Sequence, residues 1–359
     1  MVRLRYGCRL LEKVYSMKKK RKEPALDYGT EIRKLKEQGP RRLYLLWGEE
    51  DYLRDDYLKT LREICASGAG DSFQSRIFKS AQPDPVELRF AIDTLPFFSE
   101  RSLIEIREMD YLKPGDADAL ISVLEDIPEY CTVVFLPEQG EEPNGKSKIV
   151  KYLREHGTEI RFTVQDQNML IRWITRRFAY YGKSLEIEAA QRLIWLSGDQ
   201  MKRLIPEIEK IAAYAKGEKV TVSDVNAVAN RIPEADIFEL TDAIAERRFN
   251  TAAGILADLL EQRDNSVPAI LSMLSNQFRR LYLATQTRNT AELMELSGIK
   301  YDFMARRLLQ SARSFQPKQL QQAVSLCARA DYRLKSEGTD EKQLLKETLM
   351  RIALEVSDG

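Results

Sequence analysis

The most constraining feature of the sequence is a change of pattern near residue 165. Before it, short apolar runs alternate with stretches of helical spacing. Five of these runs are predicted strands: residues 43–47, 75–78, 103–106, 132–136 and 160–164. Strands that alternate with helices favour a mostly parallel sheet with helices on both faces. We therefore predict an α/β domain over residues 41–165.

After residue 165 the sequence has helical spacing and almost no strand pattern. Three apolar stripes show this spacing: Leu170, Ile174 and Phe178; Leu204, Ile208 and Ile211; and Leu271, Leu274, Phe278 and Leu281. Such stripes face a protein core far more often than a cofactor. A break at residues 231–234 divides the helices. It predicts a small helical domain over residues 166–232 and a larger one over residues 233–359.

Length and charge limit the function classes that are open to this chain. Its 359 residues suggest two or three domains, and its net charge of +1 excludes nucleic-acid binding through overall charge. Any DNA contact must come from a local patch or from partner proteins. Two helix faces carry clustered arginines, at Arg172, Arg176 and Arg177 and at Arg279 and Arg280. Such faces are more often solvated surface than phosphate sites.

Cysteine and histidine usage excludes much catalytic and metal chemistry. The four cysteines, Cys8, Cys65, Cys131 and Cys327, are scattered and form no CxxC pair. Lone thiols fit a reducing cytoplasm better than a disulfide framework. The only histidine, His156, lies in a polar stretch typical of a helix end, so we expect a solvated residue there rather than a general base or metal ligand. We predict no catalytic residue and no metal site.

The N-terminal region is basic and lacks the apolar core of a signal peptide. Residues 1–42 are rich in Lys and Arg, with five consecutive basic residues at 18–22. We expect residues 1–40 to form a disordered basic extension, with a DNA-binding arm as the alternative, and Met17 is a candidate start of translation. No apolar run approaches the length of a membrane span, so we expect a cytoplasmic protein without a membrane partner.

The first predicted strand leads into an acidic turn. Residues 44–47 are followed by Gly48 and then by Glu49, Glu50 and Asp51. Negative charge suits the start of a helix, so the turn predicts that a helix begins here. The same charges would repel a bound triphosphate.

A second motif is the apolar segment Leu95, Pro96, Phe97 and Phe98, between a predicted helix and a predicted strand. Pro96 disfavours helical backbone at Leu95, so the segment is predicted to be a loop. A loop cannot easily bury two adjacent Phe rings in its own core. The pair therefore predicts an exposed site that fits a pocket on a partner protein. The alternative is that both rings pack on the sheet.

A third segment combines the helical regions 198–211 and 237–244. In order and spacing, the acidic turn, the Leu-Pro-Phe-Phe loop and these helices resemble the delta subunit family of bacterial DNA polymerase III clamp loaders. The resemblance covers residues 40–355. It rests on the three segments together, because no single one of them is specific to the family.

This resemblance implies a fold class, partners and a site. The fold would be an AAA+-like (P-loop NTPase-type) parallel-sheet domain without working ATP chemistry, then an all-α part made of a helical lid and a helical collar. Leu95, Pro96, Phe97 and Phe98 would insert into the beta sliding clamp. The collar would join the gamma/tau and delta prime subunits of a complex that acts on primer-template DNA. The resemblance implies no cofactor and no catalytic activity of the chain itself. Catalysis would belong to the DNA polymerase holoenzyme of which the chain is a subunit.

One motif favours a different function. Residues 140–147 match the P-loop pattern through Gly140, Gly145, Lys146 and Ser147, after a predicted strand and before a predicted helix. Two glutamates would put negative charge inside the phosphate cradle, and a proline removes one backbone N–H. The match also follows the fourth strand, whereas AAA+ relatives have this loop after the first. We therefore expect an exposed surface loop here and no nucleotide site.

The sequence leaves three candidate functions. The expected one is a clamp-loader subunit of this family that binds and opens the beta sliding clamp for loading onto primed DNA. The first alternative is an active AAA+ ATPase that uses residues 140–147. The second is a non-replicative AAA+-like adaptor with another partner.

Overall fold

The structure is a computed structural model, and it describes residues 26–67, 75–79, 83–97, 99–108, 117–138, 141–262, 265–336, 338 and 340–357. The chain forms two compact units. Unit 1 contains residues 1–47 and 59–163, and unit 2 contains residues 48–58 and 164–359.

Unit 1 is built on a five-stranded sheet with the strand order β2-β3-β4-β1-β5. The strands are β1 (Leu43–Gly48), β2 (Arg76–Lys79), β3 (Ser102–Arg107), β4 (Cys131–Leu136) and β5 (Thr158–Phe162). β3 pairs in parallel with both β2 and β4, and β4 pairs in parallel with β1. Every residue of β1 and β4 is buried, as expected for central strands of a parallel sheet covered on both faces. The edge strand β2 buries only Phe78.

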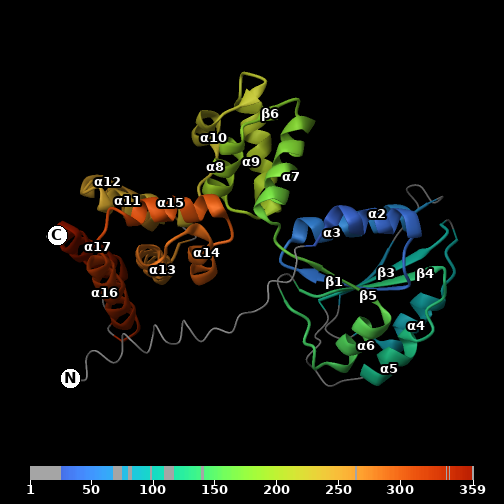
Figure 1. The fold of residues 1–359 in the computed structure, drawn as a ribbon. Coiled ribbons are helices and arrows are strands. Elements are labelled where there is room, and N and C mark those ends of the chain that lie inside the picture. The colour runs from blue at the N-terminus through green and yellow to red at the C-terminus, as the bar shows by residue number, and fades with distance from the viewer. Residues whose placement is uncertain are drawn as a thin grey trace. The chain divides into compact units, whose positions relative to one another are not determined.

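Helices cover both faces of this sheet (Figure 1). α2 (Tyr28–Gln38) and α3 (Asp51–Cys65) lie on one face, and α4 (Pro85–Asp93), α5 (Ala117–Leu124) and α6 (Lys148–His156) lie on the other. The core on the second face joins side chains of the strands, such as Ile104 and Val133, to Leu88, Leu120 and Leu153 of the three helices. The five predicted strands and the parallel sheet between helices are confirmed, although β5 begins two residues before the predicted strand.

Part of the predicted disordered extension is a helix, so that prediction is wrong for residues 28–38. α2 begins after Asp27, whose side chain accepts a hydrogen bond from the Thr30 backbone N–H at 3.3 Å. Leu35 is its buried residue and anchors the helix to the unit. A capped helix with one apolar anchor was hidden by the high Lys and Arg content of the region. Residues 1–25, with Met17 and Cys8, lie outside the described residues.

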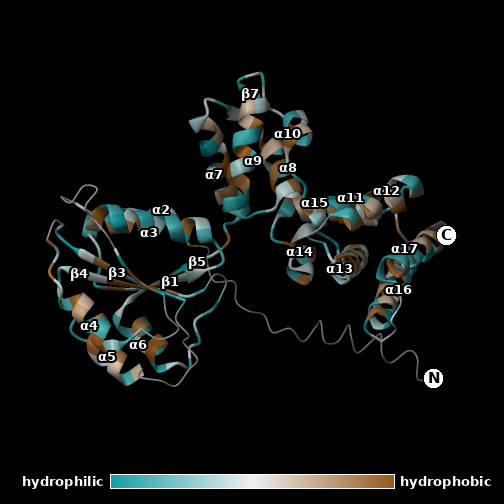
Figure 2. Ribbon diagram, turned by 180° about the vertical axis from the view of Figure 1, so that it is seen from behind, coloured by the Kyte–Doolittle hydropathy of each residue, from teal (hydrophilic) through white to brown (hydrophobic). Residues whose placement is uncertain are grey.

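Unit 2 is helical apart from one small sheet. Its first helices are α7 (Gln167–Tyr180), α8 (Ile187–Ser197), α9 (Met201–Tyr214) and α10 (Val222–Val228), with β6 (Ser184–Leu185) and β7 (Lys219–Val220) between them. Brown apolar stripes alternate with teal polar stripes along α7, α8 and α9 in Figure 2, as the sequence spacing predicts. The parallel β6–β7 pair was not predicted, because two residues per strand leave no alternating pattern.

The remaining helices follow a break at the predicted position. They are α11 (Pro233–Ala245), α12 (Phe249–Glu261), α13 (Val267–Gln286), α14 (Thr290–Ser297), α15 (Asp302–Ala312), α16 (Pro317–Ser336) and α17 (Glu341–Ser357). α13 packs on α16, and α16 packs on α17. The fold class, a parallel-sheet domain followed by helices, is therefore confirmed. Among the described helices, none is long and apolar enough to cross a membrane.

The break before α11 is held by charged and aromatic contacts. Arg231 Nε lies 2.6 Å from Asp236 Oδ1, and Arg231 Nη2 lies 2.8 Å from Glu239 Oε2. The Trp195 ring on α8 lies 4.3 Å from the Phe238 ring on α11, measured between centroids. The helices on either side of the break thus belong to one unit, and the domain boundary at residues 232–233 stays a prediction.

Candidate protein-binding surface

Helix α4 is firmly delimited at both ends. The Asp84 side chain accepts a hydrogen bond from the Val86 backbone N–H at 2.9 Å, and Pro85 occupies the first turn. At the other end Thr94 Oγ1 donates to the Phe90 carbonyl at 2.6 Å, and Tyr130 Oη donates to the Asp93 carbonyl at 3.2 Å. The loop that follows therefore leaves the helix from a fixed point.

The loop exposes two of its apolar side chains. Phe97 is 91% exposed and Leu95 is 63% exposed, whereas Pro96 is half-buried. Phe98 lies outside the described residues. Exposure of Phe97 argues against the alternative in which this ring packs on the sheet. After the loop, Ser99 Oγ donates to the Arg101 carbonyl at 2.8 Å and the chain enters β3.

Two further apolar residues on α4 are exposed and were missed by sequence reasoning. Val86 is 77% exposed and Phe90 is 68% exposed. They are four residues apart, so they share one side of the helix, while Leu88 and Ile92 face the core. The sequence does contain a signal for these two residues, because the short predicted helix has apolar residues on two sides. We call Val86, Phe90, Leu95 and Phe97 the α4 surface.

Charged residues border the α4 surface. The guanidinium carbon of Arg76 lies 5.9 Å from the centroid of the Phe90 ring, within the range of a cation–π contact. On the helix itself Arg89 Nε lies 2.7 Å from Asp93 Oδ2 and its Nη2 lies 3.3 Å from Asp126 Oδ2. Hydrogen bonds to these two carboxylates raise the pKa of Arg89. Apolar side chains bordered by charge are typical of a surface that binds another protein.

The P-loop match forms a loop that satisfies its own donors. Asn144 Oδ1 accepts a hydrogen bond from the Lys146 backbone N–H at 3.0 Å, and the Asn144 carbonyl accepts one from Ser147 at 2.9 Å. A side chain at Gly145 would approach the Arg154 guanidinium to 3.0 Å. Gly140 lies outside the described residues. Two backbone N–H groups that a phosphate cradle would use thus donate to Asn144 within the loop.

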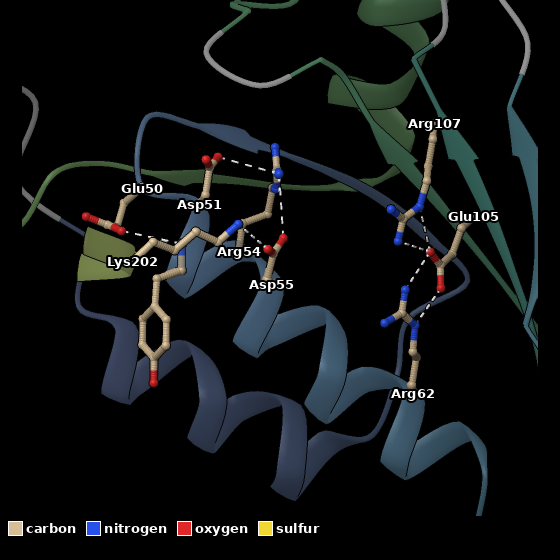
Figure 3. A network of polar contacts seen from close by, with 9 residues as sticks. Glu50, Asp51, Arg54, Asp55, Arg62, Glu105, Arg107 and Lys202 are labelled. Atoms are coloured by element: carbon tan, nitrogen blue, oxygen red, sulfur yellow. Dashed lines mark hydrogen bonds and ion pairs between the residues drawn. The ribbon is translucent and has the colours of Figure 1, made fainter. Parts of the chain in front are cut away.

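Two of the three acidic residues in the turn after β1 are buried. Glu50 is 3% exposed and Asp51 is 5% exposed. Burial raises the pKa of both side chains, that of Glu50 to about 7. Figure 3 shows them beside Arg54, Asp55 and Lys202. A phosphate bound here would face two carboxyl groups, one of them partly ionised at neutral pH.

The remaining candidate residues are the histidine and the three described cysteines. His156 is the last residue of α6, and its ring centroid is 4.5 Å from that of Tyr152. Cys65, Cys131 and Cys327 are buried and unpaired, and burial raises the pKa of the first two to about 11 and of the third to about 12, so these thiols stay protonated. The described residues contain no group of His, Cys, Asp and Glu that could hold a metal ion.

The arginines singled out as basic faces differ in exposure. Arg172 and Arg176 on α7 and Arg279 on α13 are exposed, whereas Arg280 is half-buried. Desolvation by burial lowers the pKa of Arg280, and the neighbouring Arg279 adds to this effect. These side chains remain candidates for phosphate contacts.

Two family models match the chain. The model described as "DNA polymerase III, delta subunit" matches residues 44–163, and the one described as "DNA polymerase III delta subunit, C-terminal domain" matches residues 234–352. The first match contains the α4 surface, and the second covers most of the helices from α11 onward.

Relatives match over most of the chain. The DNA polymerase III subunit delta of Bacillus subtilis (strain 168) is 26% identical over 322 residues, which cover 86% of this chain and 91% of the relative. The probable DNA polymerase III subunit delta of Aquifex aeolicus (strain VF5) is 22% identical, covering 86% and 90%. A solved structure, the Bacillus subtilis DNA clamp loader delta protein (YqeN), matches in fold with a TM-score of 0.54 and 22% identity, over 90% of this chain and 99% of that one.

Proposed function

This chain belongs to the family of DNA polymerase III delta subunits, and from that premise we propose that it binds the beta sliding clamp and opens it for loading onto primed DNA. The observation that supports the proposal most is the exposure of Phe97, at 91%, in a loop held between α4 and β3. An aromatic ring left in water by its own domain gains free energy when a partner pocket buries it.

In this proposal α4 is a rigid base and the loop is an apolar wedge. Leu95 and Phe97 enter the clamp first, while Val86 and Phe90 cover the rim of the same interface. Opening is a population shift, in which the chain binds the open or strained clamp more tightly than the closed one. The chain itself needs no catalytic residue, cofactor or metal for this step. ATP bound by other subunits would decide when the wedge is accessible.

The helices over residues 233–359 are proposed to form the collar that joins the gamma/tau and delta prime subunits. On α17, Met350 is 59% exposed and Leu354 is 62% exposed. They are four residues apart and therefore lie on one side of the helix. Exposed arginines such as Arg172 and Arg279 are candidates for contact with primer-template DNA in the assembled complex.

The proposal is tested by binding of the purified chain to immobilised beta sliding clamp, with variants at single positions. Phe97→Ala should weaken binding by about 2 kcal/mol or more, as expected for an aromatic hot spot. Leu95→Ala should weaken it as well. Wild-type affinity of both variants would contradict the proposal.

Two exposed residues of unit 2 provide matched controls. Leu354 is 62% exposed and Leu95 is 63% exposed, so Leu354→Ala removes a leucine of equal exposure. Tyr180, 81% exposed, serves the same purpose for Phe97. Both control variants should bind the clamp as the unchanged chain does.

The alternatives give different outcomes in the same assay. A chain that never binds the clamp but captures another protein through Phe97 would be an adaptor. A chain that binds ATP and loses this binding in Lys146→Ala would be an ATPase that uses residues 140–147.

A further inference from the structure

The buried carboxyl group of Glu50 lies at the start of two helices, α3 and α9. Glu50 directly precedes α3, and its carbonyl accepts the first helical hydrogen bond from the Arg54 backbone N–H at 3.2 Å. Its side chain accepts a second bond from the Tyr52 backbone N–H at 3.4 Å. Glu50 is thus the N-cap residue of α3. The backbone N–H of Met201, the first residue of α9, also lies against this carboxyl group and favours its ionised form.

Helix α9 has no cap of its own. The side chain of its N-cap residue, Gln200, makes no capping hydrogen bond, and its first turn contains no acidic residue. The first backbone N–H groups of any helix lack partners within that helix and carry partial positive charge. Met201 itself is 1% exposed, so water does not satisfy its N–H group. The carboxyl group of Glu50, 151 positions earlier in the sequence, lies against this N–H group.

The arrangement has the form of an anion site that is already filled. A strand followed by a tight loop and a helix start presents backbone N–H groups to a phosphate in many nucleotide-binding proteins. Here β1 leads through Gly48, which has a φ of 139°, to the start of α3, and a side chain of the protein occupies the position in front of the N–H groups. Glu50 is 3% exposed, which leaves little access for an external anion.

We propose that Glu50 is a positioning residue whose carboxyl group acts as an internal ligand, tying the first turn of α9 to the first turn of α3 without a bound nucleotide. The start of α9 is further linked to α3 by Lys202, whose Nζ lies 2.6 Å from Asp55 Oδ2 (Figure 3). Tyr301 adds a third element, because its Oη donates to Asp199 Oδ2 at 3.0 Å. The first turns of α3 and α9 would therefore stay together irrespective of ATP.

Charged and titratable groups from three elements interact with Glu50: Asp51 of α3, Asp199 before α9 and Tyr301 before α15. A second set interacts with these groups or their neighbours: Arg54, Asp55, Lys202, Lys300 and Asp166. Burial raises the pKa of Glu50 from 4.5 to about 7, and the charges of Asp199 and Asp51 add to this effect. The folded chain therefore binds a proton here that the unfolded chain has released. The contribution of Glu50 to stability is complete below pH 4.5 and is lost as the pH rises through 7.

Hydrogen exchange measured by mass spectrometry on the full chain tests this inference without the clamp, so its outcome is separate from that of the proposed function. In Glu50→Ala, the segments that begin α3 and α9 should exchange roughly 5–30-fold faster, the factor expected for losing a helix cap. Added acetate, which can enter the vacated space, should slow exchange in both segments of this variant and leave the unchanged chain unaffected. Glu142→Ala, which changes an exposed glutamate outside both helices, should leave both segments as they are.

Glu50→Gln keeps an oxygen acceptor and removes the titrating proton. It should hold both segments near their original exchange rates, and its melting temperature should fall less between pH 5.5 and pH 8 than that of the unchanged chain. Unaltered exchange at the start of α9 in Glu50→Ala would overturn the inference. So would a Glu50→Gln variant with the original pH dependence, or a Glu50→Ala variant whose exchange is insensitive to acetate.

Discussion

Replacing Leu95 and Phe97 together with alanine should remove most of the clamp affinity and little of the stability. Burying a Leu or Phe side chain fully gains about 1.5–3 kcal/mol. Phe97 is 91% exposed before binding and Leu95 is 63% exposed, so nearly all of this gain is still available for Phe97 and about two thirds for Leu95. Allowing for imperfect burial in the partner pocket, the double change should cost about 3–4 kcal/mol, or roughly 10²–10³ in affinity.

The stability of the free chain separates this account from a core-packing role. Exposed residues contribute little to folding, so the double variant should stay within about 0.5 kcal/mol of the unchanged free energy of unfolding. Removing a buried Phe would instead cost about 3–5 kcal/mol. The assay pairs the melting temperature of the free variant with its affinity for immobilised clamp. A variant that unfolds, or one that binds the clamp at full strength, would refute the reasoning.

Three other predictions concern sites away from the loop. The purified chain should neither bind nor hydrolyse ATP, and a titration that detects micromolar binding abolished by Lys146→Ala would reverse this conclusion. A chain that starts at Met17 should keep the melting temperature and clamp affinity of the full chain, whereas a marked loss of either would show that residues 1–16 are structural. Glu105→Gln should destabilise unit 1 by about 2–3 kcal/mol in urea unfolding, because it removes the buried negative charge to which Arg62 and Arg107 donate hydrogen bonds, and a change below 0.5 kcal/mol would show that these ion pairs contribute little.

The magnitude for Glu105 follows from its geometry. The carboxylate is fully buried and accepts from Arg62 Nε at 2.7 Å, Arg62 Nη2 at 2.8 Å and Arg107 Nη2 at 2.7 Å (Figure 3). Burial alone would raise its pKa, but these hydrogen bonds outweigh burial and lower it. Both arginines are about one third exposed, so loss of the carboxylate should cost less than breaking a fully buried pair.

The elements that could be predicted are those with long, consistent patterns. β1 and β4 are continuous apolar runs and α9 repeats its apolar residues at helical spacing, so both kinds of element were found with their type correct. The β6–β7 pair has two residues per strand and is held by a register between Ser184 and Lys219 that no local pattern reveals. Local pattern therefore identified the architecture but not the small elements that tertiary contacts create.

The candidate surface was predictable in part. The proline and adjacent rings of the loop marked it as unusual, and the exposure of Leu95 and Phe97 fits that prediction. Val86 and Phe90 were missed because exposed and core residues cannot be distinguished in a nine-residue helix that is apolar on two sides. The burial of Glu50 could not be predicted either, because the residues that it meets at the start of α9, such as Met201, are adjacent to it only in the folded chain.

Photo-cross-linking from position 97 tests the central claim most directly. A photo-reactive phenylalanine analogue replaces Phe97 in the full chain, which is mixed with purified beta sliding clamp and irradiated, and the cross-linked peptide is identified by mass spectrometry. The account predicts a cross-link to the clamp that disappears when excess unmodified chain competes, with none from the same analogue at Tyr180. A chain that binds the clamp yet cross-links from position 180 and not from position 97 would contradict it.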